Sequence, residues 1–148
     1  MAATLLRRAL VLETKEKFYM DLDKLHSSLR KKVDRILVAG DFNCRLASDA
    51  RLIYKDILGP FVYHDLLTLD NGYCVLSFAR HSSLRVLNTY FGKKDIKLQT
   101  WQHPTGFKAM MDLILAPIGK KLVITNIQVS RKADANSDHF LLTFKTSA

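Results

Sequence analysis

Apolar residues recur every three or four positions between residues 14 and 33, and this spacing predicts an amphipathic helix. The apolar positions of this segment are Phe18, Leu22, Leu25, Leu29 and Val33. We expect Thr14 to cap the helix, its apolar face to pack on a sheet, and His26 to lie at the surface. A second helix is expected over residues 70–79, where an Asp-Asn-Gly turn precedes apolar residues at helical spacing, and it should cover the sheet.

Short apolar runs between polar segments predict the strands. The run at residues 36–39 is typical of a strand buried on both faces. Gly40 should end it, so that Asp41 and Asn43 emerge at the edge of the sheet while Phe42 turns into the core. Further strands are expected at 85–91, from 100 to Pro104, and at 110–115, 122–131 and 140–144. Residues 44–69 read as a loop with one irregular helical turn.

Polar residues stand at the ends of these apolar runs: Asp41, Asn43, Asn88, Thr100, Asp112, Ser137, Asp138 and His139. Several strand ends that present Asp, Asn, Thr and His are what a hydrolytic metal site assembled from loops requires. A buried Asp112 would need a partner, because an unpaired carboxylate is costly away from water. Two structural alternatives stay open: an ordinary strand-to-loop connection for the Asp41 turn, and a core amide with satisfied hydrogen bonds for Asn88.

The segments GDFN, NTYF, TWQHPTG, MDLIL and SDHFLL occur here in the order and approximate spacing of the endonuclease/exonuclease/phosphatase superfamily, which the chain resembles. Within it, the chain looks most like the LINE retrotransposon-type endonuclease domain and the craniofacial development protein 2-like sequences. The resemblance implies an α/β fold of the deoxyribonuclease I-like type, a four-layer α/β/β/α sandwich. The chain would be a partial copy that lacks the N-terminal strands, with an atypical N-terminal start at residues 1–12 and the partial domain at 13–148.

The same resemblance implies the roles of the site residues. Asp41 would orient or deprotonate a water molecule, and Asn43 would hold a phosphate oxygen. His139, oriented by Asp112, would stabilise the transition state, and Asp138 would join the shell of a Mg²⁺ ion. The resemblance further implies phosphate or DNA contacts by Asn88, Thr100 and Ser137. Because the family's principal metal-binding Glu cannot be found in this chain, we expect Mg²⁺ to bind weakly.

The amino-acid composition favours certain binding partners and a certain cellular compartment for this protein. The chain has 148 residues, 48% of them apolar and 25% charged, which suits one globular domain. A net charge of +9, from 23 Lys and Arg against 14 Asp and Glu, favours DNA as a partner, although solvated lysines alone could give the same balance. The isolated Cys44 and Cys74 indicate neither a zinc site nor a disulfide framework. We therefore expect an intracellular protein, nuclear or cytoplasmic, that neither carries a mitochondrial targeting signal at residues 1–12 nor enters a membrane.

Two functions follow from the sequence. The first is Mg²⁺-dependent phosphodiester hydrolysis by a DNA-nicking endonuclease of retrotransposon origin, weak or lost in this chain. The second is a catalytically inactive remnant that acts as a nucleic-acid-binding or protein-binding module. Whether the chain is an enzyme is left open at this point. Because the missing strands would leave apolar sheet surface uncovered, we also expect self-association through the exposed sheet.

Overall fold

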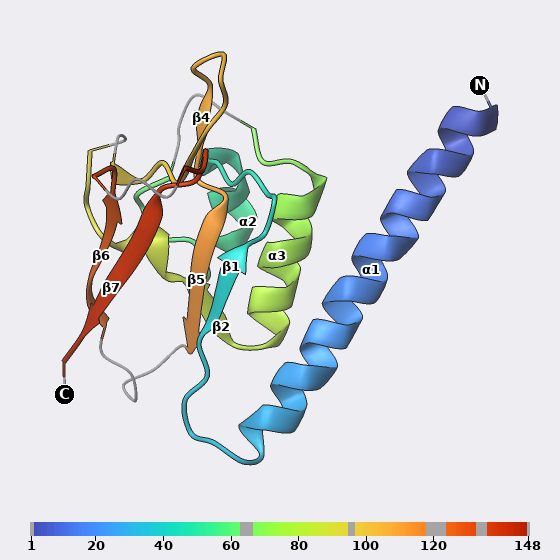
Figure 1. Cartoon of the computed structure of the whole chain (residues 1–148). Coiled ribbons are helices and arrows are strands. Elements are labelled where there is room, and N and C mark those ends of the chain that lie inside the picture. Colours follow the sequence, from blue (N-terminus) through green and yellow to red (C-terminus); the bar gives the residue numbers. More distant parts are fainter. Residues whose placement is uncertain (1, 63–66, 95–96, 118–123, 133–135, 148) are drawn as a thin grey trace.

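The computed structural model describes all residues except 1, 63–66, 95–96, 118–123, 133–135 and 148 (Figure 1). Its helices are α1 (Ala2–Arg30), α2 (Arg51–Tyr54) and α3 (Asp70–His81), with 3-10 turns η1 (Ser48–Ala50) and η2 (Leu87–Tyr90). Its strands are β1 (Val38–Asp41), β2 (Leu84–Val86), β3 (Trp101–Gln102), β4 (Lys108–Ala109), β5 (Asp112–Pro117), β6 (Ile124–Ser130) and β7 (Leu141–Thr146). The predicted mixed α/β fold is confirmed.

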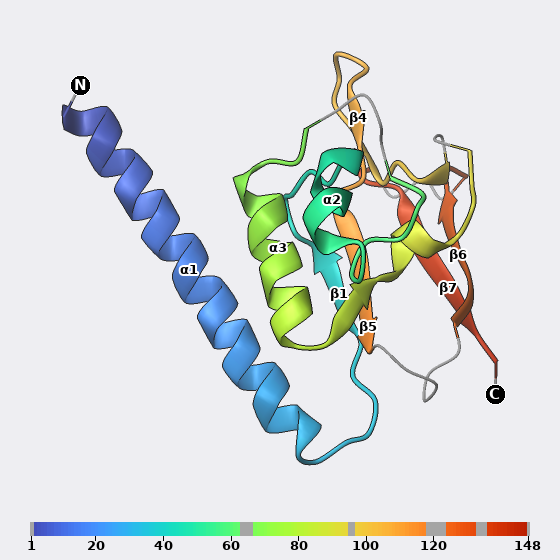
Figure 2. The same cartoon turned by 180° about the vertical axis from the view of Figure 1, so that it is seen from behind.

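The strands form three antiparallel groups. β1, β5 and β2 make one sheet in the order β1-β5-β2, while β3 pairs with β4 and β6 pairs with β7. Both cartoons show α1 outermost, followed by α3, then the β1-β5-β2 sheet and finally the β6-β7 pair (Figures 1 and 2). The central sheet thus has helices on one side and the β6-β7 pair on the other.

β5 is the central strand, and it is buried on both faces. Leu113 and Leu115 are fully buried and belong to the main hydrophobic cluster, whereas the alternate residues Ile114 and Ala116 are 2% and 3% exposed and lie outside it. Successive side chains on a strand point to opposite faces, so the two pairs serve two different interfaces. This explains the continuous apolar run, because a strand covered on both sides has no position that prefers water.

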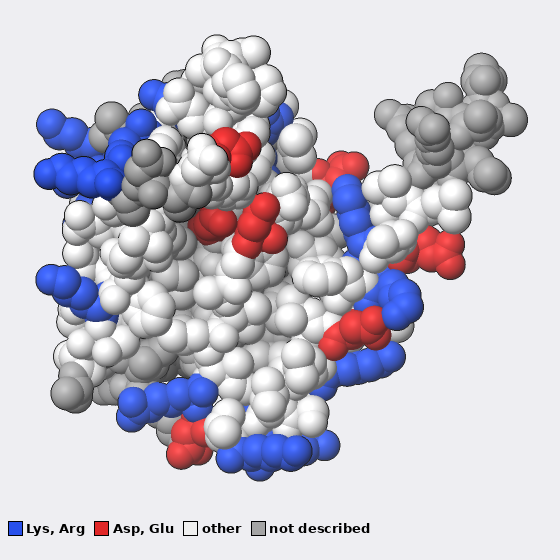
Figure 3. Space-filling view, in the orientation of Figure 1, with Lys and Arg blue, Asp and Glu red and all other residues white. Residues whose placement is uncertain are grey.

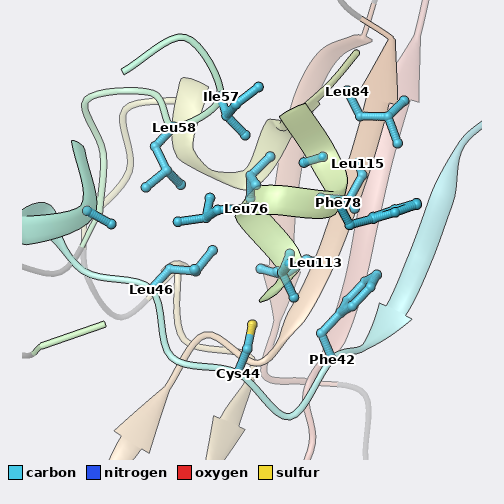
Figure 4. Packing of buried hydrophobic residues seen from close by; sticks show 14 of the residues in the cluster. Phe42, Cys44, Leu46, Ile57, Leu58, Leu76, Phe78, Leu84, Leu113 and Leu115 are labelled. Carbon is cyan, nitrogen blue, oxygen red and sulfur yellow. The ribbon is translucent and has the colours of Figure 1, made fainter. Parts of the chain in front are cut away.

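The main core lies between α3 and the β1-β5-β2 sheet (Figure 4). Val75, Leu76, Phe78 and Ala79 of α3 are buried in it at the three- and four-residue spacing that puts side chains on one helical face. Phe42, Cys44 and Leu46 close the same core from the segment after β1, alongside Ile57 and Leu58. The prediction that Phe42 turns inward is therefore confirmed, and so is the covering role of the second helix.

β1 differs from its prediction. The strand begins at Val38, two residues later than the expected run, and it continues through Gly40 to Asp41. Among the described strands it pairs with β5 alone, so it lies at an edge of the sheet, and Ala39, Gly40 and Asp41 are exposed. The strand buried on both faces is β5, which lies in the middle of the sheet with the helices on one side and the β6-β7 pair on the other.

α1 also differs from its prediction. It begins at Ala2, so Thr14 lies inside the helix, where its hydroxyl donates a hydrogen bond of 2.8 Å to the carbonyl of Leu10. The face turned to the body carries Tyr19, Leu22 and His26, and α1 lies against α3 and not on the sheet. His26 is 3% exposed, and its burial together with nearby Arg30 lowers the pKa of its imidazole.

Most of the apolar residues predicted to face a sheet lie in water. Phe18, Leu25 and Val33 are 55%, 57% and 48% exposed. Helical spacing identified an apolar stripe, but it could not say which side of the helix would meet the protein. In both views the N-terminal end of α1 stands away from the rest of the molecule (Figures 1 and 2). No helix in the described part of the chain is both long and apolar enough to cross a membrane.

The central position of β5 gives a testable prediction. Replacing Leu113 by Ala should lower the free energy of unfolding by about 2–5 kcal/mol, because Leu113 is fully buried and a cavity would remain. The matched control is Leu52→Ala on α2, where the side chain is 89% exposed and the change should stay within about 0.5 kcal/mol. Urea unfolding followed by circular dichroism measures both, and equal losses in the two variants would contradict this account of the core.

Candidate active site

Three strand ends meet at one edge of the molecule. β1 ends at Asp41, β5 begins at Asp112, and these two residues are directly paired in the antiparallel register. β7 begins at Leu141, and His139 lies two residues before it. Carboxylates from two neighbouring strands and an imidazole from a third segment are therefore brought together from positions 41, 112 and 139.

His139 lies between the two carboxylates. Its Nδ1 is 2.9 Å from Oδ2 of Asp112, within hydrogen-bond distance, and its Nε2 is 3.8 Å from Oδ2 of Asp41. With Asp112 accepting the Nδ1 proton, the ring orientation is fixed and Nε2 is turned toward Asp41 and the open side. The side chains of Asp41 and His139 are 35% and 31% exposed, so a substrate can reach them.

The segment before β7 is held against β3. The backbone N–H of Gln102 donates to the carbonyl of Asp138, and the N–H of Phe140 donates to the carbonyl of Thr100. The Trp101 indole Nε1–H also donates to Oδ2 of Asp138 at 2.7 Å. These bonds fix both neighbours of His139, so its ring is positioned by backbone pairing as well as by Asp112.

The surroundings of His139 favour its protonated form. Partial burial acts to lower the pKa of the imidazole, but the hydrogen bond to Asp112 and the charges of Asp112, Asp41 and Asp138 act to raise it. The net result is a pKa above the ordinary value for histidine. A protonated His139 can donate from Nε2 to an oxygen anion, which is the property needed to stabilise developing negative charge.

Asn88 and Thr100 lie beneath the site and not at its mouth. Asn88 is 3% exposed; its Nδ2 donates to the Asp112 carbonyl, and its Oδ1 accepts the Ile114 N–H at 2.8 Å. Thr100 is fully buried, and its Oγ1 accepts the backbone N–H groups of Met111 and Asp112, both at 2.9 Å. In this structure both side chains hold the start of β5, so they position Asp112. The sequence predicted a strand over residues 85–91, but Asn88 lies in the 3-10 turn η2.

Asp41 and Asn43 form a tight turn. Asp41 Oδ1 accepts the backbone N–H of Asn43 at 2.8 Å, and Asn43 has a φ of 45°, a left-handed conformation that Asn tolerates better than most residues. Asn43 lines a cavity of about 450 Å³ together with Lys15, Arg45, Trp101 and Phe107. The turn therefore presents Asn43 to a space large enough for a small ligand.

Ser137 stands beside His139 and shapes its backbone. The Ser137 hydroxyl Oγ accepts the N–H of His139 at 3.1 Å, a local bond that bends the chain into β7. The adjacent Asp138 and His139 would point to opposite faces in an extended strand. This bend accounts for how two neighbouring residues can approach one site.

The described residues do not form a ready metal centre. Among them, no three His, Cys, Asp or Glu side chains are grouped so as to hold a metal ion. Oδ2 of Asp112 already binds His139, and Oδ2 of Asp138 already accepts from Trp101. Mg²⁺ usually takes one or two carboxylates with several waters, and here a histidine that favours its cationic form lies between the two nearest candidates. The donor set as placed does not fit Mg²⁺.

Charge is unevenly distributed over the face that Figure 3 shows. Acidic groups gather in its upper central part, surrounded by uncharged surface, and Lys and Arg lie mostly toward the rim and along α1 (Figure 3). A chain of net charge +9 thus carries a local acidic cluster. The carboxylates near His139 act to raise the pKa of that imidazole.

The fold and the site together define an α/β protein with an Asp-His-Asp cluster at the edge of its central sheet. Over 132 residues, 87% of this chain, the sequence is 30% identical to craniofacial development protein 2 of Tragulus javanicus and 29% identical to that of Bos taurus. The chain is therefore homologous to a segment of that protein, and it spans 22% and 21% of the length of these relatives. No family model matches the chain, and no solved structure matches it.

Sequence patterns did not identify two contributors to the site. Asn71 was expected only as part of a turn, yet its Nδ2 donates to the carbonyls of Phe42 and Asn43. The sequence pattern gave Trp101 no role in the site, yet its indole N–H donates to Asp138. A side chain that bonds a backbone group 28 residues away leaves no local periodic signal. These contacts could be found only once the chain was folded.

The environment of His139 predicts its titration. In an NMR titration, the His139 ring should show a pKa above about 6.5, and Asp112→Asn should lower it by removing both the charge and the strongest acceptor. Because folding raises the pKa of His139, its protonation stabilises the folded protein. This contribution to the free energy of unfolding is complete below the unfolded-state pKa and is lost as pH rises through the folded-state pKa. Asp21→Asn, an exposed change on α1, serves as the control and should leave His139 unaltered. An unchanged His139 pKa in Asp112→Asn would refute the pairing.

Proposed function

We propose that this chain carries the acid-base part of a phosphodiester-hydrolysing site that acts on DNA. The observation that carries the proposal is the His139 imidazole, bonded to Asp112 through Nδ1 and turned toward Asp41 through Nε2. The same residue types, in the same roles, are implied by the resemblance to LINE-type endonuclease domains and to the wider endonuclease/exonuclease/phosphatase superfamily. The homology to craniofacial development protein 2 supports a shared fold and carries no statement of activity.

The chemistry divides between the two ends of the imidazole. Asp112 holds the ring and keeps Nδ1 protonated, so that Nε2 can donate to the phosphate oxygens as negative charge builds on them. Asp41, with Oδ1 engaged by the Asn43 N–H, has Oδ2 on the open side, where it can orient an attacking water molecule. Asn43 would hold a phosphate oxygen from the neighbouring cavity. The resemblance would place Asp138 in the shell of a Mg²⁺ ion. The nicking assay with and without EDTA tests that dependence on magnesium.

Plasmid nicking tests this proposal. Purified protein with Mg²⁺ should convert supercoiled plasmid to the open circle slowly, and Asp41→Ala and His139→Ala should each lower the rate at least about a hundredfold, the usual worth of a general acid or base. EDTA should stop the reaction if a metal takes part. His81→Gln, an exposed histidine at the far end of α3, is the matched control and should nick like the unaltered protein. Nicking that survives His139→Ala would exclude the proposed site.

A second candidate is binding without cleavage. The absence of a metal-ready cluster among the described residues favours it, as does the net charge of +9. Such a module would attract nucleic acid through phosphate neutralisation, a term that needs no catalytic geometry. The site residues would then serve mainly to order the edge of the sheet.

The binding candidate predicts a marked dependence on salt. The logarithm of the affinity for a DNA duplex, measured by fluorescence anisotropy, should fall linearly with the logarithm of NaCl concentration, by a slope of about −0.9 for each phosphate neutralised. Lys15→Ala should reduce that slope by about one, because Lys15 lines the cavity beside Asn43. Lys17→Ala is the control, since Lys17 is paired with Asp21 on α1 and lines no such cavity. An affinity for DNA that does not change with NaCl concentration would contradict electrostatic binding.

A further inference from the structure

The two carboxylates of the site are held with unequal firmness. Asp112 begins the central strand, where Asn88 and Thr100 bond its backbone from below. Asp41 ends β1, an edge strand that is exposed at this point. Beyond Asp41 the turn keeps one bond to the segment before β5, from the Phe42 N–H to the carbonyl of Met111. Support for Asn43 must come from elsewhere, because a one-sided strand end frays easily.

Asn71 supplies that support from the first turn of α3. Its Nδ2 donates to the carbonyls of both Phe42 and Asn43, the latter at 3.2 Å. These carbonyls flank the residue whose N–H binds Oδ1 of Asp41, and Asn43 itself has the left-handed φ of 45°. One amide group thus bonds two successive carbonyls of the turn.

Tyr19 of α1 completes the arrangement. Its hydroxyl donates to Oδ1 of Asn71 at 3.2 Å, and its ring packs against the main core and Phe78. An amide could otherwise turn over and present its oxygen to the two carbonyls, which would repel it. The two carbonyls can only accept, so they require Nδ2 of the amide, and the Tyr19 O–H adds a bond to Oδ1 that supports the same orientation.

We propose that Tyr19 and Asn71 are positioning residues that couple α1 to the Asp41–Asn43 turn and so set the geometry of the site. The contact chain runs from the Tyr19 hydroxyl to the Asn71 amide, then to the carbonyls of Phe42 and Asn43, and through the Asn43 N–H to Asp41. These contacts order the turn together with the bond from the Phe42 N–H to the Met111 carbonyl. Its effect on hydrolysis rests on the proposed function.

The experiment measures the exchange rate of the Asn43 backbone N–H by NMR in the whole chain. In Asn71→Asp, a carboxylate of the same size would face two carbonyls, so the turn should open and exchange should rise at least about tenfold. A negative charge in the first turn of α3 suits the helix dipole, so the α3 amides should keep their protection. Tyr19→Phe, which removes one hydroxyl, should speed Asn43 exchange about fivefold.

Tyr73→Phe is the matched control. It also removes a single hydroxyl, which donates to Oδ2 of Asp49 at 3.2 Å, away from the turn. Asn43 exchange should not change in this variant. Urea unfolding of all three variants separates local opening from a general loss of stability, because general loss would speed exchange throughout α3 and β5.

Two results would overturn the proposal: Asn43 exchange that stays at its original rate in a folded Asn71→Asp protein, or exchange that rises equally in Tyr73→Phe. If plasmid nicking is found, Tyr19→Phe should lower kcat and leave KM within about twofold, because a misplaced Asp41 affects the reacting water more than binding. If no nicking is found, the exchange rates still decide the positioning role, so the two proposals can fail separately.

Discussion

β5 is closed to water on both faces over residues 113–116, and the remaining elements are arranged around that fact. Two buried faces need two covering layers, and these are α3 with the segment after β1 on one side and the β6-β7 pair on the other. Because β5 is buried between these layers and paired with β1 and β2, the positions of its ends are also fixed. Its first residue, Asp112, is therefore held at a defined place at the edge of the sheet, where β1 ends and the segment before β7 passes.

Buried polar side chains hold the site residues in place through hydrogen bonds to the backbone. Asn88 and Thr100 carry no charge, yet they satisfy backbone groups at the start of β5 that would otherwise be buried without partners. Asp112 in turn holds His139 through Nδ1. This side of the site is built from enclosed contacts, whereas Asp41 stands on an open edge strand and depends on Asn71 and Tyr19 from the helices.

Electrostatics links the small cluster to the whole chain. Three aspartates surround His139 and raise the pKa of its imidazole, although partial burial opposes them. The chain as a whole is strongly basic, with a net charge of +9. A basic chain and a local group of carboxylates that raises the pKa of His139 can therefore coexist, because net charge is a sum over all residues and the pKa depends on contacts within a few ångströms.

Local patterns were enough to predict the α/β class, the helix at α3, the apolar run of β5 and the inward turn of Phe42. They also singled out Asp41, Asp112 and His139, because a polar residue at the end of an apolar run stands out in the sequence alone. These features depend on neighbours along the chain, and periodicity and turn chemistry record such neighbours directly.

Other features depended on contacts between distant segments. The sequence placed the doubly buried strand at residues 36–39, but sheet order made β1 an edge and β5 the centre. It showed an apolar stripe on α1, but packing against α3 chose the face with Tyr19, Leu22 and His26. It marked Asn88 and Thr100 as polar, but only the fold directed them to the backbone of β5. Amino-acid order fixes which residues can be buried or bonded, and the tertiary structure selects partners among them, because that choice is settled by how all the segments pack together.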